Sequence, residues 1–375
     1  MGQTKILLVS ASAGNGHTRA AEALRMHACG AGVVVTHIDI LKFASPLLRT
    51  VYTRLYAGLV KHAPALWSHV YRSTHHAKRD GAGHALRRWA ERINSTRFLR
   101  EVAKIAPDLI VCTHFLSADI LSQLIARGGL RCPVWVQVTD FDLHRIWVHE
   151  HMAGYFVANE EVAFRLREHG VAADRIHVTG IPIMPAFSEH HDRDACGREL
   201  GLAPHRMTIL LMGGGAGFGT VTDIAGRLLR AGGDVQIIAL AGRDKSVLAA
   251  LTDLASRYPG RLAPLAHTDK IERLMACSDL VVTKPGGLTT SESLAIGLPM
   301  VVIAPIPGQE EHNANFLLER GAAMKAFDLL TLEYRVRYLL AHPVKLAEMR
   351  ANAQALGRPA AASRVLATAL GQFKE

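Results

Sequence analysis

The chain has 375 residues, of which 49% are hydrophobic and 20% charged, and 43 lysines and arginines against 33 acidic residues give it a formal net charge of +10. This composition excludes a disordered chain, because it supplies enough apolar surface for full cores, and the length predicts two domains. No apolar run reaches the ~18 residues of a membrane span, and five scattered cysteines without a C-x-x-C pair argue against a disulfide framework or zinc site and favour a reducing cytoplasm.

Short β-rich runs alternate with helix-length segments along the whole chain. The runs are apolar throughout, as expected of parallel strands buried on both faces, and the βαβ rhythm occurs twice. We expect strands at 6–10, 33–37, 109–113, 134–139, 155–158 and 176–179, and again at 208–212, 235–240, 280–283 and 300–304. The clearest helical segments between them span 19–29, 160–169, 244–257 and 311–319.

A polar, broken segment separates the two halves. The sequence predicts an α/β protein with an N-terminal domain over 1–186, a linker over 187–205 and a C-terminal domain over 206–358. Two doubly wound parallel sheets of this kind bind ligands at the carboxyl ends of their strands, here facing a cleft between the domains.

The first strand ends in S-A-S-A-G-N-G-H, and a helix follows. Gly14 and Gly16 allow a tight turn, and His17 stands at the helix N-terminus, able to take a proton from a hydroxyl near neutral pH. One alternative is a nicotinamide dinucleotide site with Asp39 on the ribose, although Arg19 replaces the third glycine of that motif. The other is a helix-capping histidine without chemistry.

The second half opens with L-L-M-G-G-G-A-G-F-G, which has five glycines between Gly213 and Gly219. Glycines at a strand–helix junction let backbone N–H groups crowd an anion, so the loop predicts a phosphate cradle. It lacks the Gly-Lys-Ser/Thr ending of a P-loop, so ATP hydrolysis is not indicated. A turn that merely needs flexibility is the alternative.

The segment V-T-K-P-G-G-L-T-T-S-E carries the strongest signal. A strand meets Lys284–Gly287 and a helix follows, which predicts a second diphosphate site, with Glu292 in about the first turn to accept ribose hydroxyls. After the next strand, Gln309 and Glu310 occupy a strand-end loop and suit sugar hydroxyls. Alternatively, these acids and Glu311 simply favour helix N-termini.

Two other polar groups are weaker signals. His144, His149 and His151 have a spacing that fits no usual zinc pattern. Asp140 follows a buried strand in V-T-D-F, either to contact an acceptor or to cap a turn.

The net charge is local. Residues 42–104 hold thirteen lysines and arginines against three acids, an excess equal to that of the whole chain, interleaved with tyrosine, tryptophan and phenylalanine. This pattern predicts an anionic membrane surface as partner. A solvated helical hairpin is the alternative, whereas nucleic acid is disfavoured because no recognition fold accompanies the patch.

Together these motifs resemble glycosyltransferase family 28, in its branch of monogalactosyldiacylglycerol synthases and processive diacylglycerol glucosyltransferases. The resemblance covers nearly the whole chain and includes S-A-G-N-G-H, V-Q-V-T-D-F followed by Trp147, V-T-G-I-P-I, the M-G-G-G loop, and K-P-G-G-L-T-T-S-E through P-G-Q-E-E-H-N. It implies a GT-B fold of two Rossmann-like domains, with the nucleotide-sugar in the second, the lipid acceptor in the first, and a C-terminal helix within 359–375 that crosses back to the first.

The resemblance also implies residue roles. His17 would be the general base, Glu292 would hold the ribose, and Gln309 with Glu310 the hexose. The diphosphate and uracil contacts would come from Gly214, Gly215, Gly217, Thr268, Lys284, Gly286, Gly287, Leu288 and Thr289, and the acceptor contacts from Gly14, Asn15, Gly16 and Asp140. No cofactor and no essential metal is expected.

The expected activity is that of an inverting UDP-hexose glycosyltransferase, using galactose or glucose, on diacylglycerol or a similar lipid. It would work in the cytoplasm, peripherally associated with the inner face of the cell membrane through residues 42–104, without nucleic acid. One alternative is a peptidoglycan-type UDP-N-acetylglucosamine:lipid transferase, disfavoured because Ile181 stands where that enzyme usually has asparagine. Another is a non-membrane UDP-sugar epimerase or hydrolase on the same fold.

Overall fold

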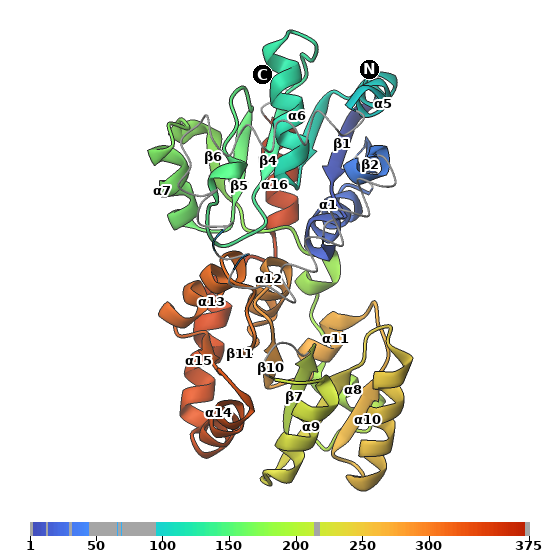
Figure 1. Ribbon diagram of the computed structural model, residues 1–375, viewed down its shortest axis with the longest axis vertical. Coiled ribbons are helices and arrows are strands. Elements are labelled where there is room, and N and C mark those ends of the chain that lie inside the picture. Colours follow the sequence, from blue (N-terminus) through green and yellow to red (C-terminus); the bar gives the residue numbers. More distant parts are fainter. Residues whose placement is uncertain are drawn as a thin grey trace. The chain divides into compact units, whose positions relative to one another are not determined.

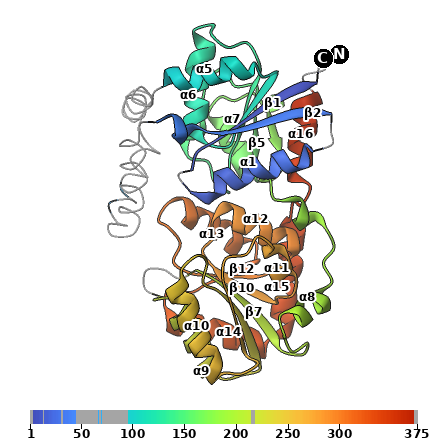
Figure 2. The same ribbon diagram turned by 90° about the vertical axis from the view of Figure 1, so that its right-hand side faces the viewer.

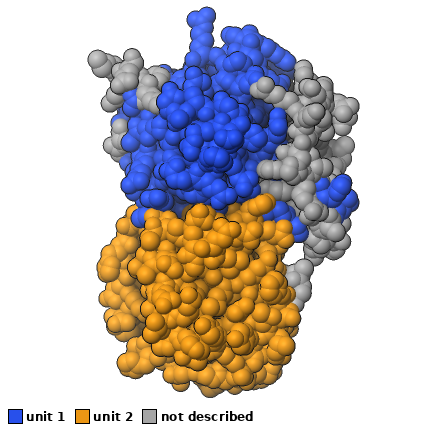
Figure 3. All heavy atoms as spheres, turned by 90° about the vertical axis from the view of Figure 1, so that its left-hand side faces the viewer, with its two compact units in different colours: residues 1–185, 307–309, 358–375 blue, residues 186–306, 310–357 orange. Residues whose placement is uncertain are grey.

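The computed structural model describes residues 3–12, 14–29, 32–44, 66, 69, 95–213 and 218–371. The chain divides into two compact units, unit 1 with residues 1–185, 307–309 and 358–375, and unit 2 with residues 186–306 and 310–357 (Figure 3). Each unit holds a six-stranded parallel sheet, which confirms the predicted α/β class. Within the described part of the chain, no helix combines the length and apolar character that a bilayer crossing requires.

Unit 1 is built on a sheet with the strand order β2-β1-β3-β4-β5-β6 (Figure 1). Its strands are β1 (Thr4–Ser10), β2 (Val33–Asp39), β3 (Leu109–Cys112), β4 (Val134–Gln137), β5 (Gly154–Val157) and β6 (Ile176–Val178). Its α-helices are α1 (Asn15–His27), α5 (Ser95–Ile105), α6 (Phe115–Ala126), α7 (Glu160–Glu168) and α16 (Ala361–Gly371), and short 3₁₀ helices are η1 (Ile40–Phe43), η2 (Arg145–Trp147) and η3 (Ala173–Arg175).

Strand β1 explains why its sequence is apolar without a break. Successive side chains of a strand point to opposite faces. Leu7 and Val9 pack into a core that includes side chains of α5, α6 and α7, whereas Ile6 and Leu8 pack into a second core with side chains of α1 and α16. Both faces of the sheet are therefore covered, as in other doubly wound folds.

Helix α16 belongs to unit 1 although it ends the chain, and it lies beside α1 (Figures 1 and 2). Its buried Val365 and Leu366 join the core that contains Ile6 and Leu8. Where the chain approaches this helix, Gly180 has a φ of +93°, and a Cβ there would lie 2.6 Å from Cβ of Arg358. A glycine is thus required at this position.

Unit 2 is built on a sheet with the order β12-β11-β10-β7-β8-β9. Its strands are β7 (Met207–Met212), β8 (Val235–Leu240), β9 (Leu262–Leu265), β10 (Leu280–Thr283), β11 (Met300–Val302) and β12 (Ala323–Lys325). Its helices are α8 (Arg193–Glu199), α9 (Val221–Arg230), α10 (Lys245–Arg257), α11 (Ile271–Ala276), α12 (Gly287–Ile296), α13 (Gln309–Glu319), α14 (Leu329–Ala341) and α15 (Pro343–Leu356), and η4 spans Pro185–Ser188.

Several elements differ in detail from the sequence expectations. Helix α1 begins at Asn15 rather than at residue 19, and α13 begins at Gln309 rather than at residue 311. Residues 187–205, expected as a linker, belong to unit 2 and contain α8, which is fixed by an ion pair between Arg193 and Asp279 (2.8 Å). Most of the basic segment 42–104 lies outside the described residues, which resume there with α5.

Candidate active site

Three loops of unit 1 leave its sheet at one edge, the carboxyl end of the parallel strands. Strands β1, β3 and β4 are neighbours, and they are followed by residues 14–17, by Thr113 and His114, and by Thr139 and Asp140. Because the chain turns from β1 to β2 on one side and to β3 on the other, this is the switch point at which such sheets bind ligands.

His17 is the third residue of α1, and it is fastened to the loop after β3 at two points. Its Nδ1 lies 2.9 Å from the carbonyl oxygen of Thr113, whose hydroxyl donates in turn to the carbonyl of His17 (2.9 Å). A carbonyl can only accept, so Nδ1 carries the proton and Nε2 carries the lone pair. This tautomer presents Nε2 as a base.

The surroundings of His17 keep the ring neutral. Burial lowers the pKa of His17 to about 4, although the hydrogen bond to Thr113 works in the opposite direction. A histidine with this pKa is unprotonated throughout the neutral range, which a general base requires.

An aromatic wall packs around His17. The ring of His114 stands edge-on to it, with the ring centroids 4.6 Å apart, and the indole of Trp147 lies 6.1 Å away. His114 is buried, and its Nδ1 accepts from the backbone N–H of Leu116 (3.1 Å). Burial, with the neighbouring His17 as the smaller cause, holds the pKa of His114 well below its usual range. Two neutral imidazoles therefore stand side by side.

The sequence-predicted acceptor residues lie on the same loops. Gly14 is the N-cap of α1, Asn15 and Gly16 are in its first turn, and Asp140 directly follows Thr139. The backbone of Gly14 is extended, and a Cβ built there meets none of the described residues within 4 Å. The fold itself therefore does not require glycine at this position, and the open space suits a ligand.

The sequence analysis missed three residues of this site. Thr113, His114 and Thr139 contact His17 directly. Each follows a buried strand within one or two residues, which is the signal that singled out Asp140. That signal marks each of them as a candidate, but the contact with His17 depends on the order of the strands in the sheet.

The sequence-predicted donor residues begin at the N-terminus of α12 in unit 2. The loop after β10 carries Lys284 and Gly286, and no side chain caps the helix end among the described residues. The first backbone N–H groups of α12, from Gly287, Leu288 and Thr289, therefore suit an anion.

Helix α13 supports this loop. The buried Asn313 donates to the carbonyl of Pro285 (3.1 Å), another contact the sequence did not suggest. Glu310 accepts from the backbone N–H of Ile306 (2.7 Å), and its Oε1 is 3.8 Å from a Cβ built at Gly286. Burial raises the pKa of Glu310, while Ile306 and the charge of Lys284 oppose the shift. The structure thus brings Glu310 to the α12 terminus.

The other predicted donor residues lie within α12, at the start of α13 and after β9. Glu292 is the sixth residue of α12, beyond the expected first turn, and is only 4% exposed. Gln309 is the first residue of α13. Thr268 lies in the loop after β9, where its hydroxyl accepts a hydrogen bond from the backbone N–H of Lys270 (3.0 Å). Gly214, Gly215 and Gly217 lie outside the described residues.

The histidines after β4 have structural partners. His144 caps η2 by accepting from the N–H of Ile146, and His149 has its Nδ1 3.7 Å from Asp119. Among the residues that the structure describes, no group of three or more His, Cys, Asp or Glu side chains is placed to hold a metal ion. The expectation of metal-independent activity remains a prediction.

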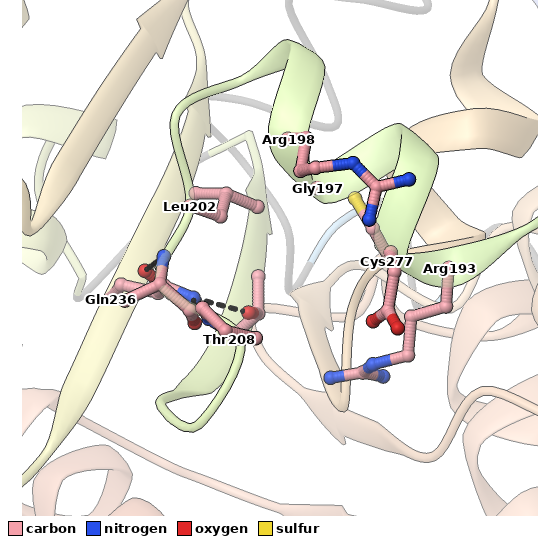
Figure 4. A pocket seen from close by; sticks show the side chains of 10 residues that line it. Arg193, Gly197, Arg198, Leu202, Thr208, Gln236 and Cys277 are labelled. Carbon is pink, nitrogen blue, oxygen red and sulfur yellow. Dashed lines mark hydrogen bonds between the residues drawn. The ribbon is translucent and has the colours of Figure 1, made fainter.

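A small pocket of unit 2 lies away from these loops. It has a volume of about 220 Å³ and is lined by residues of α8 and of the amino-terminal ends of β7 and β8 (Figure 4). Gln236 donates across it to Thr208 (2.9 Å) and to the carbonyl of Ala203 (2.8 Å). These hydrogen bonds tie the loop after α8 to the sheet, so we assign the pocket a structural role.

Comparisons with known proteins match one family model to each half of the chain. The family model of monogalactosyldiacylglycerol (MGDG) synthase matches residues 17–183, and that of the glycosyltransferase family 28 C-terminal domain matches residues 208–365. The processive diacylglycerol beta-glucosyltransferase of Bacillus licheniformis is 31% identical over 353 residues, which cover 94% of this chain and 90% of the relative.

Solved structures share the fold. MurG of Acinetobacter baumannii has a TM-score of 0.64 at 16% identity, with 98% of this chain and 99% of the other covered. MnaA of S. aureus, in a co-structure with UDP, has a TM-score of 0.62 at 11% identity, with 100% and 98% covered. The two-domain GT-B fold expected from the sequence is thereby confirmed.

Proposed function

Because the chain belongs to the monogalactosyldiacylglycerol synthase and processive diacylglycerol glucosyltransferase branch of glycosyltransferase family 28, we propose that it transfers a hexose from a UDP-hexose to diacylglycerol with inversion. The relative's name specifies a beta-glucosyl product, which favours glucose over galactose. The donor sugar of UDP-glucose is α-linked, so a β product requires a single displacement at the anomeric carbon.

The observation that carries this proposal is the fixed tautomer of His17. Nε2 removes the proton of the acceptor hydroxyl, and the oxygen attacks the anomeric carbon opposite the leaving group. The bond from that carbon to the diphosphate breaks, and its electron pair leaves with UDP. Gly14, Asn15, Gly16 and Asp140 line the approach of the acceptor.

Unit 2 binds the donor. The N–H groups at the start of α12 stabilise the diphosphate and its growing charge during departure, together with Gly214, Gly215 and Gly217. Glu292 holds the ribose, Gln309 and Glu310 the hexose, and Thr268 the uracil. Helix N-termini supply the electrophilic assistance, so the reaction needs no essential metal.

Residues 42–104 bring the enzyme to its lipid. Each basic residue near an anionic surface contributes ~1 kcal/mol, so a local excess of ten charges is ample for peripheral binding at the inner face of the membrane. Charge reversal at Arg87, Arg88, Arg92 and Arg100 should release the protein from anionic vesicles in a flotation assay while UDP affinity persists. If the charge-reversed protein still floats with the anionic vesicles, the basic residues of 42–104 do not carry membrane binding.

The function is tested by a matrix of radiolabelled UDP-glucose, UDP-galactose and UDP-N-acetylglucosamine against diacylglycerol vesicles. We expect labelled glucosyl-diacylglycerol, and none from His17→Ala, whose UDP affinity by calorimetry should match the wild type. Free sugar without lipid product would favour an epimerase or hydrolase instead. That alternative shares the fold, but the 31% identical relative is a transferase.

A further inference from the structure

The imidazole of His17 has a second polar neighbour besides the carbonyl of Thr113. The hydroxyl oxygen of Thr139 lies 2.9 Å from Nδ1, the same nitrogen that donates to the carbonyl of Thr113 at 2.9 Å. One N–H group thus faces two oxygens from two different loops, one after β3 and one after β4.

The two oxygens are not equivalent. The Thr113 carbonyl can only accept, so it fixes the proton on Nδ1, whereas a hydroxyl adapts and here acts as the second acceptor of the same N–H. Contacts from two different loops fix the rotation of the His17 imidazole about its side-chain bonds, whereas a single contact would leave the ring free to turn. When Nε2 takes a proton, the added charge is shared with Nδ1–H, and both oxygens then stabilise the imidazolium.

We propose that Thr139 is a positioning residue for the general base, which holds the His17 ring so that Nε2 faces the acceptor hydroxyl and stabilises the protonated ring that forms during transfer. This inference rests on the proposed function. Thr139 is only 4% exposed, and its β-branched side chain restricts χ1, so its hydroxyl stays where the ring needs it.

The chain offers a matched control. Thr179 also follows a strand of the same sheet, is 4% exposed, and donates its hydroxyl to the carbonyl of Gly180 (3.1 Å). In the described part of the chain, the side-chain contacts of His17 come from Thr113, Thr139, His114 and Trp147. Thr139→Val removes the hydroxyl at nearly constant volume, Thr139→Ser retains it, and Thr179→Val removes an equivalent buried hydroxyl elsewhere.

We expect Thr139→Val to lower kcat about 10- to 100-fold, the usual effect of losing a hydrogen bond to a charged group, with KM for the UDP-hexose unchanged. Thr139→Ser should recover most of that loss, and Thr179→Val should stay within about twofold of wild type. Equal kcat for wild type and Thr139→Val, with both proteins folded, would overturn the proposal.

A spectroscopic measurement separates this inference from the proposed function. In protein labelled with ¹⁵N-histidine, the His17 signals, identified by their loss in His17→Ala, should report a protonated Nδ1 and an unprotonated Nε2. Thr139→Val should shift the Nδ1–H resonance, and Thr139→Ser should preserve it. A protonated Nε2 in the wild type refutes the positioning role even if the Val variant fails to fold, whereas absence of glycolipid product with these shifts intact refutes only the proposed function.

Discussion

At the scale of single residues, His17 combines a low pKa with a defined tautomer. Burial brings the pKa of its imidazole to about 4. A weaker base accepts a proton less readily, but it is present in its active form at every pH above that value. Both of the Nδ1 partners found in the described residues, a carbonyl and a hydroxyl, are neutral.

The first prediction concerns the pH dependence of transfer. Because kcat/KM reports ionisations of the free enzyme, we expect it to stay level from about pH 8 down to about pH 5 and to fall by half near pH 4, where His17 becomes protonated. Initial rates at low acceptor concentration, with tryptophan fluorescence to verify folding at each pH, provide the measurement. A half-point near 6.5 would mean that the imidazole is solvated in the working enzyme.

The second prediction concerns Gly14. Its extended backbone suits any residue, and a Cβ there meets none of the described residues within 4 Å, so Gly14→Ala should change the free energy of unfolding by less than about 0.5 kcal/mol. The added methyl group occupies the space that we assign to the acceptor, so kcat/KM for the lipid should fall while UDP affinity stays constant. Gly197→Ala in α8, whose Cβ would lie 3.9 Å from Leu202, is the control that should leave kinetics unaltered. Normal lipid kinetics in Gly14→Ala would place the acceptor elsewhere.

The sequence alone indicated His17 but not the residues that orient it. Motif spacing places His17 after a strand and a glycine turn, and this information is local. Thr113 and Thr139 are 96 and 122 residues away along the chain. Their contact depends on β1, β3 and β4 being neighbours, and strand order is not written in any one segment. The residues that contact His17 are therefore harder to predict from the sequence than His17 itself.

At the scale of elements, buried strands were predictable and helix starts were not. Strands β8 and β10 agree with the sequence expectation at both ends. Each is preceded by an aspartate, and a glycine or a lysine follows within two residues of its end. Helix α1 starts four residues before the expected position. Asn15 and Gly16 have low helix propensity, so they were not expected in the helix, but the Thr113 hydroxyl donates to the carbonyl of His17 and fixes this first turn. Tertiary contacts outweighed local preference there.

Helix α8 shows a second limit. Its N-cap Asp192 accepts from the N–H groups of Asp194 and Ala195 at 2.9 and 3.1 Å, a capping signal hidden in a polar stretch that was expected to be a linker. Strand β12 was also missed, because three residues at a sheet edge give no clear pattern.

The third prediction tests the contribution of α16 to unit 1. Leu366 is 7% exposed and packs in the core that contains Trp135, so Leu366→Ala should lower the free energy of unfolding by about 2–3 kcal/mol through lost burial and a cavity. Urea unfolding followed by tryptophan fluorescence measures this change. Phe164→Ala, at a side chain of unit 1 that is 53% exposed, should have only a small effect by the same measurement. If both variants unfold alike, α16 does not stabilise the core.

At the scale of the whole molecule, histidines with lowered pKa are confined to one unit. Among the described residues these are His17, His37, His114, His149, His169 and His177, all in unit 1, and burial is the first cause for each. All four tryptophans also precede residue 186, so tryptophan fluorescence reports on the same unit. Unit 1, which carries His17, is thus the unit whose stability should depend on pH in the mildly acidic range.

The last prediction follows from the sign of these shifts. A histidine in the unfolded chain titrates near 6.5 and the buried ones lower, so below pH 6.5 the unfolded state binds more protons and stability falls as the pH falls. Each such histidine contributes up to about 1.4 kcal/mol per pH unit between its two pKa values, and His114 is almost completely buried. The urea midpoint from tryptophan fluorescence should therefore decrease steadily from pH 6.5 to pH 5, where most carboxylates remain ionised. His149→Gln should reduce that slope whatever its effect on absolute stability, since it removes one titrating group whose pKa burial lowers to about 4. A midpoint that stays constant over this interval would mean that these imidazoles are protonated in the folded protein, and the low pKa assigned to His17 would have to be abandoned with them.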